Sequence, residues 1–103
     1  MGILDSIFGN FQQSDKVKEM LQDGSKIIDV RTVGEFQGGH VAGSVNYPLQ
    51  DLERYIGEIK KLDKAPVLCC ASGNRSGQAA RFLKSKGIEC INGGSWRSVN
   101  SLV

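Results

Sequence analysis

The sequence predicts an α/β fold in which a mostly parallel sheet lies between helices. Short apolar runs typical of buried strands alternate along the chain with segments whose apolar residues recur at helical spacing. The clearest strand, residues 66–70, is apolar without alternation, as expected when helices cover both faces of a parallel sheet. A chain of 103 residues that is 40% hydrophobic has room for one compact core, so we expect a single domain over residues 1–103.

The first half of the chain predicts two helices and two strands. A helix over residues 15–23 follows polar residues that can cap it and ends before a glycine, which favours the left-handed conformation that closes many helices. Residues 26–30 and residues 44–47 are short runs with strand-forming residues, separated by a glycine-rich loop. A second helix follows Pro48, where apolar residues lie on one helical face: Leu49, Leu52, Tyr55, Ile56 and Ile59.

The second half adds two strands and a helix. Residues 66–70 form the third predicted strand, residues 78–86 form a helix that a glycine closes, and residues 88–91 form a fourth strand. Ligands of parallel α/β sheets bind at the carboxyl ends of the strands. The segment that follows residue 70 is therefore the first candidate for chemistry.

An apolar N-terminal segment, residues 1–13, precedes these elements. Its hydrophobic side chains recur at helical spacing and predict a short helix packed on the domain. The segment has no basic residue and Asp5 interrupts it, so it lacks the layout of a secretory signal peptide. Three cysteines, two of them adjacent, do not form a disulfide framework. We therefore expect a cytoplasmic protein.

Composition excludes two classes of partner. The net charge is only +2 and no run of five basic residues occurs, so nucleic acid is not an expected partner. The longest apolar run is far shorter than the roughly 20 residues that cross a bilayer, so no membrane partner is expected. The sequence does not predict an oligomeric state.

The loop Cys70-Ala71-Ser72-Gly73-Asn74-Arg75-Ser76 follows the third strand and precedes a helix. Small residues let several backbone N–H groups of such a loop point inward, and the helix N-terminus adds about half a positive charge. These dipoles and the charge of Arg75 favour a thiolate at Cys70, which is a nucleophile. The alternative is a buried, inert cysteine, which we expect at Cys69 and Cys90.

The spacing within this loop separates two kinds of chemistry. Cysteine-dependent phosphatases use Cys-x5-Arg, a loop wide enough to wrap a phosphoryl group, whereas this loop is Cys-x4-Arg. A phosphatase also needs a general acid for the leaving oxygen, and Glu89 is the only carboxylate that follows the loop. The shorter loop suits the transfer of one sulfur atom, although carboxylates that precede the loop keep the phosphatase alternative open.

Three blocks of sequence carry specific motifs. Residues 29–48 contain DVR, EF and GHVAGSVNYP, residues 70–76 read CASGNRS, and residues 92–96 read NGGSW. Together they resemble the family of single-domain rhodanese-like sulfurtransferases, whose signatures are DVRxxxEFxxGHIxGAxNIP, CxxGxRS and GGxxxW. The second block matches without a gap, whereas Trp96 arrives two positions early in the third. The last helix is therefore expected to pack differently.

The resemblance implies a five-stranded, mostly parallel sheet with helices on both faces. It also implies that Cys70 takes sulfane sulfur from a small anionic donor such as thiosulfate and becomes a persulfide. The substrate-binding residues would be those of the loop, whose amides hold the persulfide while Arg75 assists the donor: Ala71, Ser72, Gly73, Asn74, Arg75 and Ser76. Cyanide, a thiol or a protein cysteine would then accept the sulfur, and neither a metal nor an organic cofactor is required.

Other polar residues receive structural interpretations. We expect Arg31 and Glu35 to form an ion pair, and His40 to fix its glycine-rich turn by hydrogen bonds. A zinc site formed by His40 and the cysteines is excluded, because no Cys-x2-Cys pair occurs. Trp96 is expected to pack in the core or line a cleft.

Two alternatives to a sulfurtransferase remain open at this point. One is a phosphatase or arsenate reductase that uses the same thiolate. The other is a non-enzymatic sulfur carrier or protein-interaction module, because an intact loop indicates a competent nucleophile but not what delivers or receives the sulfur.

Overall fold

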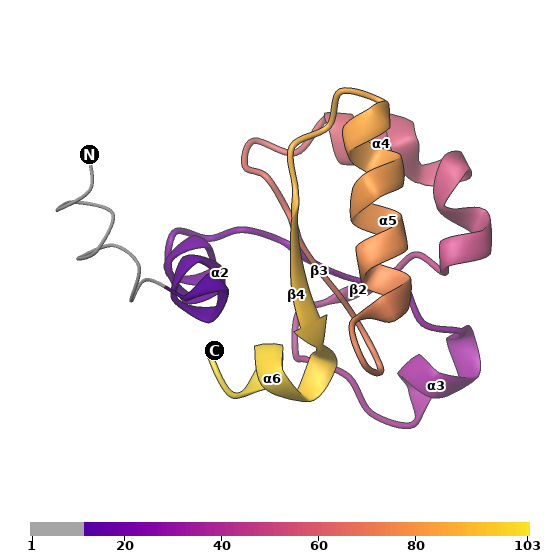
Figure 1. Cartoon of the computed structure of the whole chain (residues 1–103). Coiled ribbons are helices and arrows are strands. Elements are labelled where there is room, and N and C mark those ends of the chain that lie inside the picture. Colours follow the sequence, from indigo (N-terminus) through magenta and orange to yellow (C-terminus); the bar gives the residue numbers. More distant parts are fainter. Residues whose placement is uncertain (1–11) are drawn as a thin grey trace, which may run out of the picture.

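The computed structural model describes residues 12–103, which form an α/β fold (Figure 1). The predicted N-terminal helix over residues 1–13 lies almost wholly outside the described residues. Four strands form one parallel sheet in the order β2-β1-β3-β4. Their bounds are Ile27–Asp29 for β1, Val45–Asn46 for β2, Val67–Cys70 for β3 and Ile91–Ser95 for β4.

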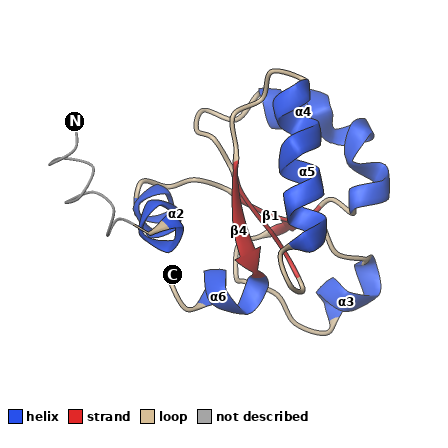
Figure 2. Ribbon diagram, viewed as in Figure 1, coloured by secondary structure: helices blue, strands red, loops and turns tan. Residues whose placement is uncertain are grey.

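Helices cover both faces of the sheet, as predicted (Figure 2). Helices α2 (Gln13–Gln22) and α6 (Trp96–Asn100) pack on one face. A 3-10 helix η1 (Leu49–Tyr55) and the helices α4 (Ile56–Lys60) and α5 (Asn74–Ser85) pack on the other. A short helix α3 (Val33–Gln37) lies beside the carboxyl edge of the sheet.

The strands fill two cores because successive side chains point to opposite faces of a sheet. Ile28, Leu68 and Cys70 lie in the core beneath α5 and η1. Ile27, Val67 and Cys69 lie in the core beneath α2 and α6, and all six of these side chains are buried. This arrangement explains why strand β3 is apolar without alternation and confirms that prediction.

The predicted fifth strand is not present in residues 12–103, where the sheet has four strands. The prediction of a strand over residues 88–91 is also wrong, because β4 begins at Ile91 and pairs with β3 from Val67 onward. Ile88 and Cys90 instead fill the core beneath α5.

Gly93 explains why a segment that reads as a turn forms strand β4. A Cβ atom at Gly93 would lie 2.7 Å from Val67 Cγ1 and 2.8 Å from Val99 Cγ2. The missing side chain therefore lets β4 approach both β3 and α6 closely. The strand depends on this tertiary contact and not on local strand propensity.

The helices agree with the sequence except at their ends. The predicted helix over residues 15–23 begins at Gln13, and the one predicted over residues 78–86 begins at Asn74, directly after the cysteine loop. The helical face that starts at Leu49 is divided between η1 and α4. Helix α3 was not predicted, and α6, which begins at Trp96, was expected only from the family resemblance and without bounds.

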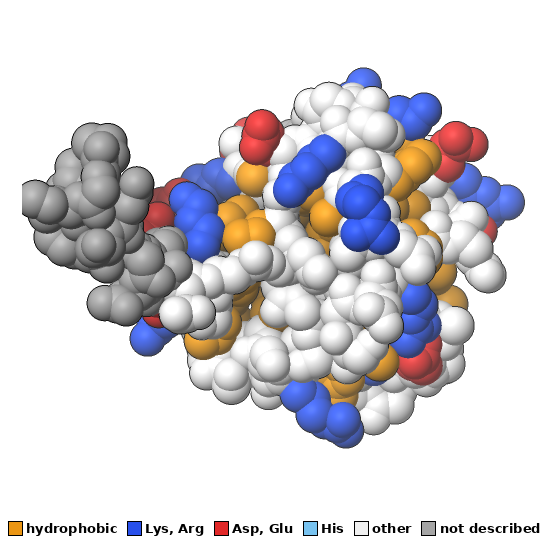
Figure 3. All heavy atoms as spheres, viewed as in Figure 1, with side chains coloured by type: hydrophobic (Ala, Val, Ile, Leu, Met, Phe, Trp, Pro, Cys, Tyr) orange, Lys and Arg blue, Asp and Glu red, His pale blue; other side chains and the backbone are white. Residues whose placement is uncertain are grey.

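On the face in Figure 3, basic side chains occur singly or in small groups among other residues, and hydrophobic side chains show as small separate areas. In the part of the chain that the structure describes, no helix combines the length and apolarity needed to cross a membrane.

Candidate active site

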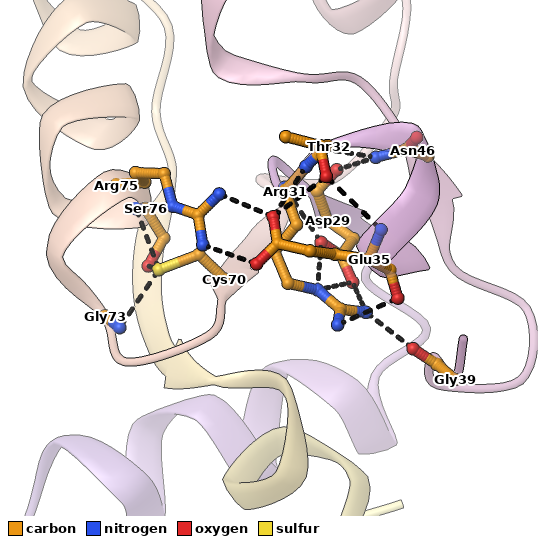
Figure 4. A network of polar contacts seen from close by, with 10 residues as sticks. All are labelled: Asp29, Arg31, Thr32, Glu35, Gly39, Asn46, Cys70, Gly73, Arg75 and Ser76. Atoms are coloured by element: carbon orange, nitrogen blue, oxygen red, sulfur yellow. Dashed lines mark hydrogen bonds and ion pairs between the residues drawn. The ribbon is translucent and has the colours of Figure 1, made fainter. Parts of the chain in front are cut away.

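The candidate site lies at the carboxyl end of β3, where Cys70 ends the strand and α5 begins four residues later (Figure 4). Gly73 is the residue before the helix and has φ of 100°, in the left-handed region that favours glycine. A Cβ atom at this position would also lie 3.3 Å from Gly94 Cα of β4. A glycine is therefore needed for the turn that carries the chain from Cys70 into α5.

Three donors of the loop converge on Cys70 Sγ. The backbone N–H of Gly73 donates at 3.0 Å, and the backbone N–H and hydroxyl of Ser76 donate at 3.3 Å each. Cys70 and Ser76 are both fully buried. The sulfur thus lies at the N-terminal end of α5, where the helix dipole adds to the field of the donors.

This environment lowers the pKa of the Cys70 thiol. Burial raises the pKa, but the hydroxyl of Ser76 and the backbone N–H groups of Ser76, Ser72 and Gly73 outweigh it. Burial raises the pKa of Cys69 to about 12 and also raises the pKa of Cys90. Among the three cysteines, Cys70 alone is in an environment that favours the thiolate. The loop N–H groups act as expected, whereas Arg75, the other expected cause, is not among the groups that act most strongly on the Cys70 pKa.

Replacing Ser76 by Ala should raise the pKa of the Cys70 thiol, because the substitution removes the strongest donor to Sγ and leaves burial unchanged. A pH titration of the thiolate by ultraviolet absorbance measures this pKa directly. Ser85→Ala, which removes a hydroxyl at the far end of α5, serves as the control and should not change the titration. An unshifted curve for Ser76→Ala would remove the hydroxyl from the account.

The side chain of Asn92, in strand β4, forms hydrogen bonds with the cysteine loop. Its Nδ2 donates to the carbonyl of Gly73 at 3.1 Å, and its Oδ1 accepts from the backbone N–H of Gly94 at 2.9 Å. Its Oδ1 also lies 2.7 Å from the Ser76 hydroxyl oxygen, whose single proton is shared between Asn92 Oδ1 and Cys70 Sγ. One amide side chain thus positions both residues that donate to Cys70 Sγ. Sequence reasoning missed this role, although Asn92 opens the third motif block.

The predicted ion pair between Arg31 and Glu35 is wrong. Arg31 binds the carboxylate of Asp29 through Nε and Nη2, with the shortest contact at 2.7 Å, and reaches only the backbone carbonyl of Glu35. The carboxylate of Glu35 instead binds Arg75 in a bidentate pair, at 2.7 Å and 2.9 Å. Arg31 pairs with Asp29 because this buried carboxylate lies two residues before it and has no access to water. Glu35 and Arg75 are 40 residues apart and are brought together by the tertiary fold.

Glu35 is fixed by the helix that contains it. Its Oε1 accepts from the backbone N–H of Thr32 at 3.0 Å and from the Thr32 hydroxyl at 3.1 Å, and Thr32 Oγ1 accepts in turn from the N–H of Glu35. This capping box forms the first turn of α3. The guanidinium of Arg75 and the Thr32 donors lower the pKa of Glu35 to about 2.

The pKa of Glu35 predicts a component of acid instability. Because the carboxyl has a pKa of about 2 in the fold against an ordinary 4.5, the unfolded chain binds more protons between these values. The contribution of Glu35 is complete above pH 4.5 and is lost as the pH falls toward 2. Urea unfolding midpoints across this range should fall less steeply for Glu35→Gln than for the wild type, and equal slopes would contradict the assignment.

Arg31 and His40 fix the glycine-rich loop that follows α3. Arg31 donates to the carbonyl of Gly39 at 2.7 Å, and its Cζ lies 4.8 Å from the centroid of the Trp96 ring. His40 Nδ1 donates to the carbonyl of Phe36 at 2.7 Å, and the two rings stack with centroids 3.7 Å apart. The prediction that His40 fixes its turn by hydrogen bonding is therefore confirmed.

The structure separates the six predicted loop residues into three groups. Gly73 and Ser76 surround Cys70 Sγ, and Arg75 faces Glu35 (Figure 4). Ala71, Ser72 and Asn74 are exposed, and of these Ser72 acts on the sulfur through its backbone N–H. In residues 12–103, no group of three or more His, Cys, Asp or Glu side chains is placed to hold a metal ion.

Comparisons with known proteins identify the family and the fold. The rhodanese-like domain family matches residues 13–98. Thiosulfate sulfurtransferase GlpE of Pseudomonas aeruginosa is 29% identical over 90 residues, covering 82% of this chain and 81% of GlpE. A crystal structure described as "rhodanese with anions from E. coli" superimposes with a TM-score of 0.66 at 28% identity, covering 73% of this chain and 91% of that one.

A further relative is larger than this chain. The protein named "Putative sulfur carrier protein YrkF" of Bacillus subtilis (strain 168) is 34% identical over 76 residues, covering 74% of this chain but 40% of YrkF. The chain spans half or less of the length of the first curated relatives that it matches. Such relatives therefore contain regions that have no counterpart in these 103 residues.

Proposed function

The chain belongs to the rhodanese-like domain family, and on this basis we propose that it is a sulfurtransferase that carries sulfane sulfur as a persulfide on Cys70. The observation that carries the proposal is the convergence of three donors on Cys70 Sγ, together with the lowered pKa of its thiol. A donor such as thiosulfate supplies the sulfur, and cyanide, a thiol or a protein cysteine accepts it. Because the thiol must stay reduced, we place this activity in the cytoplasm.

In the first step, the Cys70 thiolate attacks the outer sulfur of the donor. A bond forms between Cys70 Sγ and that sulfur, and the bond between the two sulfur atoms of the donor breaks. With thiosulfate, sulfite leaves with the electron pair, and the cysteine becomes a persulfide anion. The N–H groups of Gly73 and Ser76 stabilise the negative charge at Sγ before this transfer, and after it the charge of the persulfide lies on the outer sulfur.

In the second step, the acceptor attacks the outer sulfur of the persulfide. With cyanide, a carbon–sulfur bond forms, the Cys70 persulfide bond breaks, and thiocyanate leaves while the thiolate returns. Because the transfer is divided into two displacements, the donor and the acceptor bind to the same site at different times. The same donors that lower the pKa of Cys70 also make it a better leaving group in this step.

The structure does not favour a phosphatase. The carboxylate that contacts the loop is Glu35, which is bound by Arg75 and has a pKa of about 2. A carboxyl that is ionised at neutral pH cannot protonate a leaving oxygen. Glu35 is therefore a poor general acid, and the four-residue spacing of the loop agrees with sulfur transfer.

A sulfur carrier is the second candidate, since the relative named for that role covers 74% of this chain. Steady-state assays separate the two. Protein incubated with thiosulfate and an excess of cyanide should form many equivalents of thiocyanate, with initial-rate plots that show the parallel lines of a double displacement. Formation of a single equivalent would identify a carrier, and hydrolysis of a phosphate ester without thiocyanate would overturn the proposal.

A further inference from the structure

The charges at the candidate site are paired before any donor arrives. Arg31 and Arg75 are the arginines in the network of Figure 4, and each is bound by a carboxylate. Arg31 is buried with Asp29, and Arg75 makes a two-pronged contact with Glu35. The remaining residues of the loop, 70–74 and Ser76, carry no formal charge apart from the thiolate.

Glu35 is held in this position by contacts that do not involve Arg75. The backbone N–H and the hydroxyl of Thr32 both donate to its Oε1, and this capping box starts helix α3. With a pKa of about 2, the carboxyl is ionised at neutral pH. The pair with Arg75 is therefore neutral overall, and a donor that needs the guanidinium must compete with a carboxylate that the fold keeps in place.

Donors differ in the charge that they bring to the thiolate. Attack on thiosulfate assembles three negative charges, one from the thiolate and two from the donor, and releases sulfite as a dianion. Attack on the outer sulfur of a protonated alkyl persulfide, R–S–SH, assembles only one negative charge. In that reaction the new bond joins Cys70 Sγ to the outer sulfur, R–S⁻ leaves, and Cys70 becomes a neutral persulfide that then loses its proton.

Amide dipoles stabilise a single negative charge at Sγ, but they stabilise a dianion beside the thiolate less well than an unpaired cation would. We propose that Glu35, by neutralising Arg75, is a positioning residue that makes this site selective for alkyl persulfides over thiosulfate. The inference rests on the proposed sulfur transfer through Cys70 and specifies its donor class.

The test measures how fast each donor loads sulfur onto Cys70. Intact mass spectrometry gives the second-order rate constants for thiosulfate and for cysteine persulfide, and their ratio is the readout. Glu35→Gln keeps the capping box, since the Gln Oε1 accepts the same hydrogen bonds from Thr32, and it removes the charge and the hydrogen bond from Arg75 Nη2 to Oε2. The ratio of thiosulfate to persulfide loading should rise about tenfold in this variant. A residue with a merely structural role would change both rate constants in proportion.

Two further variants control for charge. Glu58→Gln removes an exposed carboxylate of α4 and should leave the ratio unchanged. The double variant Glu35→Gln with Arg75→Gln has no net charge at the pair, like the wild type, so its ratio should return to within about twofold of the wild-type value. A ratio that stays high in the double variant would show that Glu35 does not act through Arg75.

The outcomes distinguish this inference from the proposed function. Loading of wild-type Cys70 by both donors, with a ratio that Glu35→Gln leaves unchanged, would overturn the donor preference alone. Loading of Cys70 by neither donor would overturn the sulfur transfer and the preference together.

Discussion

Replacing Cys70 by Ser should reduce thiocyanate formation from thiosulfate and cyanide by at least about a thousandfold. A serine hydroxyl stays protonated at neutral pH and cannot carry sulfane sulfur, although it can keep hydrogen bonds to Gly73 and Ser76. The fold should therefore persist, with a melting temperature within about 5 °C of the wild type by circular dichroism.

Cys90→Ser is the matched control for this substitution. Cys90 is buried, makes only a weak contact with the carbonyl of Ala80 at 3.7 Å, and has a raised thiol pKa. We expect this variant to lose about 1 kcal/mol of stability and to keep its turnover. Turnover by Cys70→Ser protein, or its loss in folded Cys90→Ser protein, would contradict the assignment of the nucleophile.

Replacing Gly93 by Ala should destabilise the fold by about 3 kcal/mol. The new Cβ would lie within 3.0 Å of three atoms on two elements: Val67 Cγ1, Leu68 O and Val99 Cγ2. None of these is the end of a flexible side chain, since Val67 and Val99 are fully buried. Strand β4 must move away from β3, and the free energy of unfolding measured with urea reports the cost.

Gly57→Ala makes the same chemical change where there is space. Gly57 lies in helix α4, and a Cβ there would meet nothing within 4 Å. This variant should gain about 0.5 kcal/mol, because alanine restricts the unfolded chain and favours the helix. Equal stabilities for the two glycine variants would show that the packing of β4 against β3 and α6 is not as described.

The parts of the fold that the sequence predicts are those with strong local patterns. The strands around Ile28 and Leu68 are short apolar runs, and their burial between two layers of helices follows from that pattern. Helix α3 has no apolar periodicity and was missed, although Thr32 and Glu35 have the spacing of a capping box. The predicted fourth strand was misplaced because Gly93 and Gly94 have low strand propensity, and β4 forms there through its pairing with β3.

The candidate site divides in the same way. Cys70 could be identified because a thiol, small residues and a helix start are adjacent in sequence. The partner of Arg75 could not, since Glu35 lies 40 residues away and only the fold brings them together. Asn92 supports the loop from a third element, through contacts that no local pattern predicts.

The most direct test of the account is to locate the transferred sulfur. Protein treated with thiosulfate or cysteine persulfide is digested, and fragmentation of the peptides assigns any added sulfur to Cys69, Cys70 or Cys90. The account predicts one sulfur atom on Cys70, removed by cyanide with release of one equivalent of thiocyanate. Sulfur on Cys69 or Cys90, or no added sulfur with either donor, would contradict it.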